Sequence, residues 1–253
     1  MLDSYPLFDS HFHIIDPRFP LVPNQGYLPE AFTCEDYLAR MRAYNLQGGA
    51  IVSGSFQAFD QSYLLKALQT LGKGFVGVTQ VPAKIRDEQL ATLNDAGVRA
   101  VRFNLKRGGS EEIGQLESMA QRVYQLFRWH VELYVDARQL GDLKSVLLRL
   151  PAVSIDHLGL SREGLPDIQS LLEKGIRLKA CGFGRVDFDV KQALPILYRI
   201  NPEALMFGTD LPSTRAPRAY VDEDFRLITE CFEDKDAILA VLAENARQFY
   251  SRV

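Results

Sequence analysis

The sequence predicts an α/β protein of the (β/α)8 TIM-barrel class, folded as a single domain over residues 1–253. A length of 253 residues suits one such barrel. Short apolar runs recur eight times, and most of the gaps between them hold one stretch with helical spacing. Several runs, such as GGAIVSG and VSIDHLG, are almost continuously apolar, as expected of parallel strands covered by helices. An open, doubly wound sheet is the alternative, but no glycine fingerprint follows the first run.

The expected elements follow one another regularly along the chain. Strands are expected near residues 6–10, 49–53, 75–81, 98–104, 131–136, 153–157, 176–181 and 204–209. Between them, apolar residues at helical spacing, as at Tyr63, Leu64, Ala67 and Leu68, predict helices. Residues 14–32 are rich in proline and form the one long connection, of the kind that often shapes a binding site. Two helical segments near 221–232 and 236–250 are expected to close the barrel.

The composition excludes several classes of protein. Hydrophobic residues make up 47% and charged residues 24%, which is typical of a soluble globular chain. The net charge is -3 without a basic block, which argues against a nucleic-acid partner. The opening MLDSYPLFDS resembles no signal peptide, and no apolar run is long enough to span a membrane. Cys34, Cys181 and Cys231 are far apart and odd in number, which indicates reduced thiols. We therefore expect a cytoplasmic protein with no membrane partner.

The candidates for chemistry are polar residues at the carboxyl ends of the expected strands, where TIM barrels carry their active sites. The stretch FDSHFHI puts Asp9, His11 and His13 on alternate positions, so that the two imidazoles would point the same way. His130 begins a strand and is expected to be structural, at the opposite end of the barrel. Three of the four histidines and a carboxylate are predicted to meet in one pocket. The later candidates are Arg102, Asn104, Arg107, Asp156, His157, Lys179, Cys181, Arg185 and Asp210.

Several of these candidates also have a purely structural interpretation. Asp210 could cap a turn, since aspartate accepts backbone N–H bonds well. Arg102 and Arg185 could form salt bridges at the barrel rim. Lys179 could extend from the core to solvent, and Cys181 is expected to be a small core residue.

Six segments carry a resemblance to a known family. DSHFHI, VRFNL, IDHLG, GFGR, MFGTDLP and ENARQFY are similar, in this order, to the motifs of the amidohydrolase-related TIM-barrel hydrolases (amidohydrolase family 2). The resemblance extends from Phe8 to Tyr250 and is greatest to the branch of 2-pyrone-4,6-dicarboxylate lactonases and sugar lactonases. It implies one amidohydrolase-like TIM-barrel domain over residues 1–253 and a hydrolase of carboxylic esters, of the lactonase type.

The resemblance also implies roles for individual residues. Asp210 matches the family's catalytic aspartate, which we expect to be the general base. Arg102 and Arg185 match arginines that hold a substrate carboxylate, and Arg107 matches a third if one residue is deleted before it. The remaining matches are the catalytic histidines His11, His13 and His157, which would polarise the carbonyl, and the pocket residues Tyr27 and Ser55.

This chain departs from the family's pattern at three places. Cys181 stands where the related lactonases usually have serine, and residues 211–213 read Leu-Pro-Ser instead of Trp-Pro-His. Leu160 stands where an arginine is expected after the DHLG motif. A missing guanidinium removes a bidentate partner for a carboxylate. The departure at Leu160 therefore weakens the expectation of a polycarboxylated pyrone substrate. It does not affect the expected lactonase chemistry.

We expect hydrolysis without a metal, in which histidines bind the carbonyl oxygen and Asp210 takes a proton from water. The alternative is a single Zn²⁺ or Mn²⁺ held by His11, His13, His157 and Asp210. Two rival functions remain beside a lactonase acting on a small carboxylated lactone. One is a mononuclear metal-dependent decarboxylase or C–N hydrolase of the same superfamily, and the other is a non-catalytic barrel that binds a small anion. The particular lactone, its pathway and the oligomeric state stay open.

Overall fold

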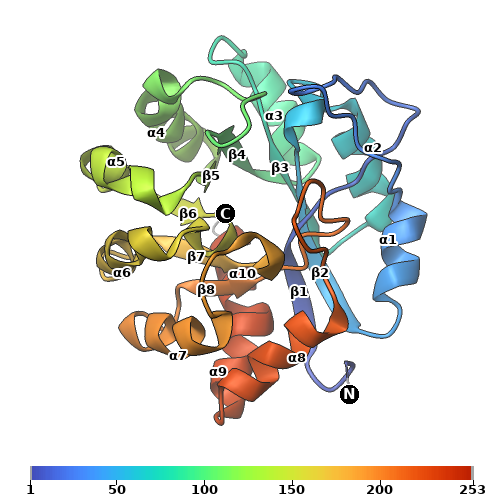
Figure 1. Cartoon of the computed structure of the whole chain (residues 1–253). Coiled ribbons are helices and arrows are strands. Elements are labelled where there is room, and N and C mark those ends of the chain that lie inside the picture. The colour runs from blue at the N-terminus through green and yellow to red at the C-terminus, as the bar shows by residue number, and fades with distance from the viewer. Residues whose placement is uncertain (1, 252–253) are drawn as a thin grey trace.

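The computed structural model describes residues 2–251, and its centre is a sheet of eight parallel strands in the order β1 to β8 (Figure 1). All seven neighbouring pairs in this order are parallel. The predicted (β/α)8 barrel is therefore confirmed. The strands are β1 (Pro6–Phe12), β2 (Asn45–Val52), β3 (Phe75–Thr79), β4 (Val98–Asn104), β5 (His130–Tyr134), β6 (Val153–Ile155), β7 (Arg177–Ala180) and β8 (Leu205–Phe207).

Helices surround the strands and cover the outer face of the sheet (Figure 1). Their apolar residues recur three and four positions apart, as at Val190, Ala193, Leu194 and Leu197 of α7, so each helix buries one face. The helices are α1 (Cys34–Met41), α2 (Ser62–Leu71), α3 (Asp87–Asp95), α4 (Leu116–Phe127), α5 (Leu140–Leu147), α6 (Leu165–Leu172), α7 (Val190–Ile200), α8 (Asp222–Cys231), α9 (Lys235–Leu239) and α10 (Asn245–Tyr250). A π-helical turn, Ala240–Glu244, joins α9 to α10. None of the helices within residues 2–251 is long and apolar enough to cross a membrane.

The barrel closes between β8 and β1 through two backbone bonds just beyond β8. The Asp210 N–H donates to the carbonyl of His11, and the His13 N–H donates to the carbonyl of Leu211, both at 2.7 Å. Gly208 allows this close approach, because a Cβ there would lie 2.7 Å from the backbone nitrogen of His11. The closing bonds therefore involve the same segments that carry the candidate catalytic residues.

An irregularity in β1 changes the predicted alternation. The register with β2 shifts between Asp9 and Phe12. Asp9 accepts a bond from the Tyr37 hydroxyl of α1 at 3.1 Å, and the Phe12 ring stacks on the ring of the same tyrosine. The expectation that Asp9 shares a face with the two histidines is therefore wrong, because the bulge turns it toward the helices.

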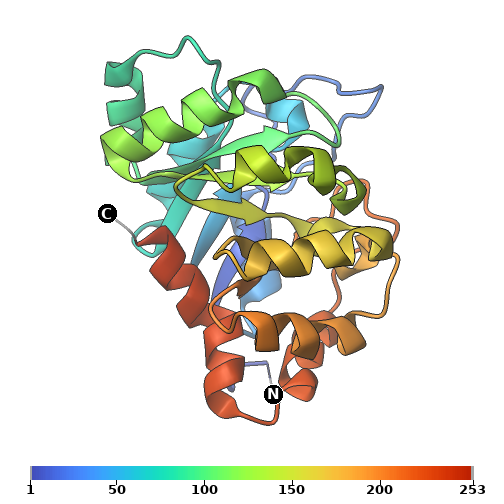
Figure 2. The same cartoon turned by 90° about the vertical axis from the view of Figure 1, so that its left-hand side faces the viewer.

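The carboxyl-terminal helix closes the amino end of the barrel (Figure 2). Phe249 and Tyr250 of α10 belong to the same buried cluster as Phe8, Ala100 and Met206 of the barrel strands. His130 begins β5 at this end, and its ring lies 4.1 Å from the ring of Phe249. These side chains fill the barrel axis at this end, and the carboxyl end is where TIM barrels carry their active sites.

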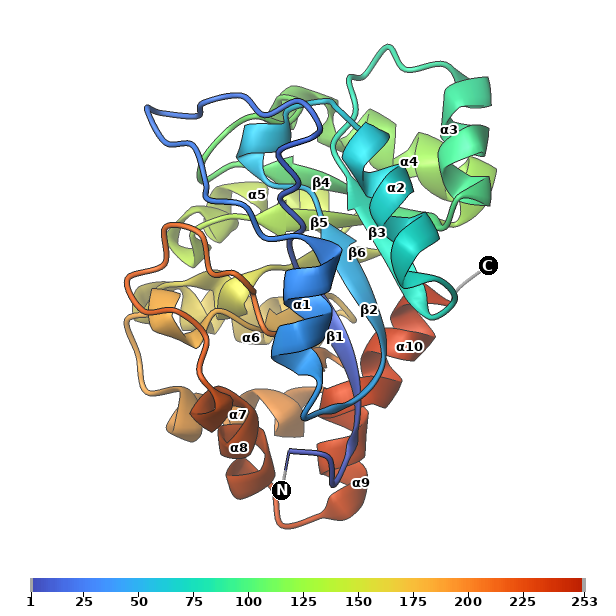
Figure 3. The same cartoon turned by 90° about the vertical axis from the view of Figure 1, so that its right-hand side faces the viewer.

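The long connection after β1 lies beyond the carboxyl ends of the strands (Figure 3). Residues 14–32 contain two isolated bridges, one between Ile15 and Phe32 and one between Asn24 and Tyr27. The Val22 N–H also donates to the carbonyl of Phe56 at 2.8 Å. These bonds hold the loop against the mouth of the barrel, where it can shape the site.

Candidate active site

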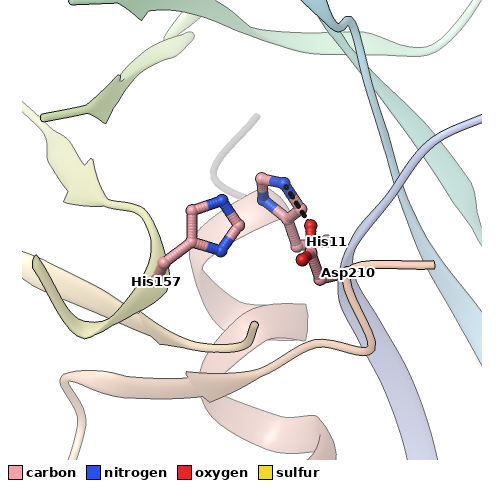
Figure 4. A group of neighbouring side chains, drawn as sticks. All are labelled: His11, His157 and Asp210. Atoms are coloured by element: carbon pink, nitrogen blue, oxygen red, sulfur yellow. Dashed lines mark ion pairs between the residues drawn. The ribbon is translucent and has the colours of Figure 1, made fainter. Parts of the chain in front are cut away.

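Four of the predicted residues come together at the carboxyl end of the barrel. His11 lies in β1 and His13 follows it, while His157 and Asp210 follow β6 and β8. The Nε2 atoms of His11 and His13 lie 3.9 Å and 3.8 Å from Asp210 Oδ1. The rings of His11 and His157 are 4.8 Å apart, and Figure 4 shows both rings beside the carboxylate of Asp210. All four side chains are buried.

Two atoms in this group are buried without a hydrogen-bond partner among the described residues. They are His11 Nε2 and Asp210 Oδ1. An unpaired buried polar atom costs about 1–3 kcal/mol, so such atoms are rare unless a ligand, water or ion pairs with them. These two atoms face each other across 3.9 Å. Their arrangement therefore indicates a binding point between them.

The backbone at the site is held in conformations that side-chain-bearing residues seldom adopt. His157 has φ 52° and Asp210 has φ 60°. Such strain is characteristic of functional positions. Gly182, with φ 60°, packs between them, because a Cβ there would lie 2.7 Å from His157 Nδ1 and 3.1 Å from Asp210 Oδ2. The surrounding structure thus sets where the imidazole and the carboxylate point.

The three imidazoles are neutral near pH 7. Burial lowers the pKa of His13 to about 3, and the charge of Arg102 adds to this effect. Burial likewise lowers the pKa of His11 well below its usual value, and the nearby Lys179 ammonium lowers it further. Burial also lowers the pKa of His157, and the neighbouring His11 lowers it further. These side chains therefore act as neutral donors, acceptors or metal ligands.

Neighbouring groups determine which nitrogen carries the proton in two of the rings. His13 Nδ1 lies 2.7 Å from the carbonyl of Val52, which only accepts, so this nitrogen is the donor and Nε2 keeps a lone pair. His11 Nδ1 lies 3.4 Å from the Nζ of Lys179, an ammonium that only donates, so we assign the His11 proton to Nε2. The two neighbouring histidines thus present opposite chemistry to Asp210.

Each carboxylate of the site is paired with an arginine. Arg185 Nε donates to Asp210 Oδ2 at 2.7 Å, and the Nε and Nη2 of Arg102 donate to Asp156 Oδ2 at 3.1 and 2.8 Å. Burial raises the pKa of Asp210 although Arg185 opposes the shift. Burial also acts to raise the pKa of Asp156, but Arg102 and Lys179 outweigh it and the net shift is downward.

A buried ion pair lies beneath the histidines and was not anticipated from the sequence. Lys179 Nζ contacts Glu132 Oε2 and lies 3.8 Å from Asp156 Oδ1, and all three side chains are inaccessible to solvent. Lys179 therefore does not extend to solvent, contrary to the structural alternative. Burial acts to raise the pKa of Glu132, but Lys179 and His130 together outweigh it and lower the pKa to about 2. The sequence signal for Glu132 was a lone acid inside the apolar stretch HVELY.

Cys181 is buried, as expected, but it also touches the site. Its Sγ lies 3.1 Å from His157 Nδ1. Burial raises the pKa of this thiol well above its usual value, and the charge of Asp210 adds to the shift, so the group is a thiol and not a reactive thiolate. Cys181 therefore helps to orient His157, with its sulfur in the place where a serine hydroxyl would stand.

A small pocket, with a cavity volume of about 30 Å³, opens above the four residues. Of the predicted substrate-binding residues, Ser55, Arg102, Arg107 and Arg185 line it. Tyr27 does not line this pocket and instead lies under the guanidinium of Arg215, 4.4 Å from the ring centre. The remaining lining residues are His13, Gly54, Phe56, Asn104, Tyr134, His157, Thr214 and Arg215.

The donor set is compatible with one divalent cation. Nitrogens of His11 and His157 and an oxygen of Asp210 lie within 4.8 Å of one another, and two of these residues contribute the unpaired atoms. Imidazole and carboxylate are ligands of Zn²⁺ and Mn²⁺. His13 is not a member of this group. A second group, His11, Glu132 and Asp156, surrounds the Lys179 ammonium, which already supplies a positive charge there.

The fold and the site together define a TIM-barrel protein with an imidazole–carboxylate centre at its carboxyl mouth. The family model described as amidohydrolase matches residues 8–252, and the chain belongs to this family. The resemblance noted in the sequence is thereby confirmed.

Named relatives of this chain include two hydrolases of lactones. The chain is 30% identical over 162 residues to a 2-pyrone-4,6-dicarboxylate hydrolase of Comamonas testosteroni, a match that covers 60% of this chain and 51% of the relative. The matched part thus spans about half the length of that enzyme. It is 24% identical over 226 residues to a 4-sulfomuconolactone hydrolase of Rhizobium radiobacter, covering 81% of this chain and 75% of the relative.

Solved structures show the same fold. A probable 2-pyrone-4,6-dicarboxylic acid hydrolase of Acinetobacter baumannii, with citric acid bound, superimposes with a TM-score of 0.83 at 21% identity and covers 96% of this chain and 98% of its own. A putative 2-pyrone-4,6-dicarboxylic acid hydrolase of Pseudomonas putida gives a TM-score of 0.78 at 24% identity, covering 99% and 98%. At these identities the likeness concerns the fold.

Proposed function

We propose that this protein hydrolyses lactones that carry a carboxylate, by attack of water on the ring carbonyl with Asp210 as general base. One observation carries the proposal. The unpaired, buried atoms His11 Nε2 and Asp210 Oδ1 face each other across 3.9 Å, at the base of a pocket lined by arginines. The activities named for the two curated relatives, both hydrolases of lactone-type substrates with acidic groups, support the same conclusion.

Asp210 and His13 are suited to hold the attacking water. Asp210 Oδ1 and His13 Nε2 are both acceptors and lie 3.8 Å apart, so one water can donate a hydrogen bond to each. As the water oxygen bonds to the carbonyl carbon, Asp210 takes its proton. The tetrahedral intermediate then collapses, the ring C–O bond breaks, and Asp210 returns the proton to the leaving oxygen. The product is a hydroxy acid or its keto tautomer.

His11 is suited to stabilise the oxyanion. Its Nε2–H is the donor that faces the site, because Lys179 contacts Nδ1. A donor positioned for the developing charge contributes about 2.7–4 kcal/mol in a comparable site. The His157 ring lies beside it and completes the surface that contacts the carbonyl. His11 and His157 thus contact the carbonyl, while His13 holds the water. The sequence-based expectation was that all three histidines polarise the carbonyl, and it is refined here because His13 presents an acceptor.

The arginines are suited to bind the carboxylate of the substrate. Arg102 and Arg185 line the pocket and are already bonded to Asp156 and Asp210, but a guanidinium has five N–H groups and both retain some for a ligand. Arg107 lines the same pocket with Ser55. A bidentate arginine–carboxylate contact would fix the ring in one orientation above the histidines.

A divalent cation, when bound, would be held by His11, His157 and Asp210 and would polarise the carbonyl as a Lewis acid. For His11 to serve as a ligand through Nε2, its proton must lie on Nδ1. There it would face Asp156 Oδ1, which is 3.5 Å away and has no hydrogen-bond partner among the described residues. The contact with Lys179 opposes this tautomer and supports the reaction without a metal.

The test is a screen of lactones with a pH indicator, combined with elemental analysis of the purified protein. We expect acid release from carboxylated lactones, faster than from neutral sugar lactones, and unchanged rates after treatment with a chelator. If no lactone of either kind is hydrolysed, the proposal is wrong. Binding of a carboxylated lactone without turnover would instead identify a non-catalytic barrel that binds anions.

A second candidate function is favoured by the metal-compatible donor group. A mononuclear decarboxylase or C–N hydrolase would use His11, His157 and Asp210 as ligands. Stoichiometric Zn²⁺ or Mn²⁺ in the purified protein, with loss of activity on chelation and recovery on adding the metal back, would select this candidate.

A further inference from the structure

Two of the four arginines that line the pocket are paired with carboxylates. Arg102 pairs with Asp156 and Arg185 with Asp210. Two other arginines of the pocket differ. For Arg107 and Arg215 no ion pair with a carboxylate is found within residues 2–251. The mouth therefore holds two guanidinium charges that the described part of the protein does not neutralise.

Arg215 is held in place by neutral groups. Its Nη2 donates to the backbone carbonyl of Asn24 at 3.0 Å and to the side-chain Oδ1 of the same residue at 2.9 Å. Its guanidinium also lies over the ring of Tyr27, 4.4 Å from the ring centre. Arg215 itself has φ 56°, a conformation that few non-glycine residues adopt. The loop of residues 14–32 thus orients this side chain before any ligand arrives, which lowers the entropy cost of binding.

Arg107 lies close enough to Arg215 for its charge to act on that residue. Burial lowers the pKa of Arg215, and the neighbouring charge of Arg107 lowers it further. Two like charges held close together without a counterion are unfavourable, and an anion that contacts both removes this repulsion.

The location of the two arginines extends the catalytic pocket. Both line the pocket above the histidines, and both also line an adjacent hollow that includes Leu160. Arg185 and Tyr134 are shared by the two hollows as well. Leu160 is the position at which the sequence lacks an expected arginine. Arg215 thus brings a guanidinium to the same side of the mouth from the loop after β8.

We propose that Arg215 is a specificity-determining residue, which binds, together with Arg107, a second anionic oxygen group of the substrate at the rim of the pocket. The group is a carboxylate or a sulfonate, attached to the lactone on the side away from the carbonyl that is attacked. This inference rests on the proposed lactonase function and adds to it the residue that selects a lactone with a second anionic group. It also explains why a chain with Leu160 retains a cationic rim.

The test compares two lactones that differ by one carboxylate. They are 5-oxotetrahydrofuran-2-carboxylate and 5-oxotetrahydrofuran-2,3-dicarboxylate, assayed with the parent protein and the Arg215→Ala variant. We expect the substitution to lower kcat/KM for the dicarboxylate by about 10- to 100-fold, the range of a charge-assisted contact, and to change the monocarboxylate less than about threefold. Arg215→Lys should recover part of the loss, because it keeps the charge but not the bidentate geometry.

Arg218→Ala is the matched control. Arg218 lies three positions further along the same loop, pairs with Asp224 at 2.8 Å and lines neither hollow. It should leave the ratio of the two kcat/KM values unchanged. Equal effects of Arg215→Ala on both lactones, or no effect on either, would overturn the inference while leaving the lactonase function in place.

A binding measurement keeps the inference separate from the proposed function. Calorimetric titration with citrate, a polycarboxylate probe, should give the parent and Arg218→Ala similar affinities. The affinity of Arg215→Ala should be at least about 10-fold weaker. This result supports the anion site even if the parent hydrolyses neither lactone, in which case only the proposed function fails. Equal citrate affinity of all three proteins would refute the anion site.

Discussion

Replacing Asp210 with asparagine tests the proposed general base. Arg185 Nε donates to Asp210 Oδ2 at 2.7 Å, and this N–H group can only donate. The amide oxygen of the asparagine must therefore take this position, and its NH2 group then occupies the place of Oδ1. That place lies 3.8 Å from His13 Nε2, which carries a lone pair. The variant thus presents a donor where the attacking water needs an acceptor.

The expected loss follows from this change. A positioned general base typically contributes about 10² to 10⁴ in rate, which corresponds to about 3–5 kcal/mol of activation free energy. We expect kcat to fall by this factor with a smaller change in KM, because the arginines that bind the substrate remain. Since Asp210 is buried and neutralises Arg185, we also expect the free energy of unfolding to fall by about 1–3 kcal/mol.

The assay is steady-state hydrolysis of a carboxylated lactone followed with a pH indicator, together with urea unfolding of the same preparations. Asp16→Asn is the matched control, because Asp16 is also a largely buried aspartate paired with an arginine, Arg18, but lines neither the pocket nor the adjacent hollow. It should keep kcat within about threefold. An Asp210→Asn variant that remains folded and turns over at a near-normal rate would refute the assignment, since asparagine caps a turn as well as aspartate does.

Three further predictions concern the surroundings of the histidines. Lys179→Met should remove the donor at His11 Nδ1, lower kcat by about 10-fold or more and increase the affinity for Zn²⁺. Turnover and metal titration measure these two effects, and unchanged values of both would contradict the assigned tautomer. Gly182→Ala should lower activity more than stability, because its methyl group would lie 2.7 Å from His157 Nδ1; loss of stability with normal turnover per folded molecule would show that the contact is only structural. Between pH 7 and pH 4 the stability supplied by neutral His13 should decline, because its pKa is about 3 in the folded protein and 6.5 for an ordinary exposed histidine, so that the unfolded chain takes up the proton first. The His13→Gln variant should therefore lose about 3 kcal/mol less than the parent over this range in urea titrations, and identical losses would contradict the lowered pKa.

The strand pattern and the site positions were accessible from the sequence because they follow from local rules. Apolar runs of strand length, separated by helical periodicity, predict the barrel, and the barrel places His11, His157 and Asp210 at one end. The orientation of each residue was harder to predict. Asp9 faces the helices because of a bulge in β1, and a bulge leaves no mark in the alternation of residues.

Long-range contacts account for the rest of what the sequence did not provide. Glu132 and Lys179 lie in different strands, and only the closed barrel shows that they pair beneath the histidines. Arg215 depends on the loop of residues 14–32, since Asn24 and Tyr27 orient it. Neither contact has a local pattern, because each partner alone is compatible with an ordinary core or surface position.

The closure of the barrel has a consequence for how activity can arise during synthesis. Asp9 accepts hydrogen bonds from the backbone N–H and the hydroxyl of Thr209. Asp9 and Thr209 lie 200 positions apart in the sequence. The same seam places His11 beside Asp210, so the proposed general base and the proposed oxyanion donor come from opposite ends of the barrel sequence. A nascent chain that has released seven strands from the ribosome would hold the histidines but not Asp210. Activity should therefore appear only after the eighth strand has docked, which makes turnover a direct readout of complete folding in pulse-labelled translation reactions.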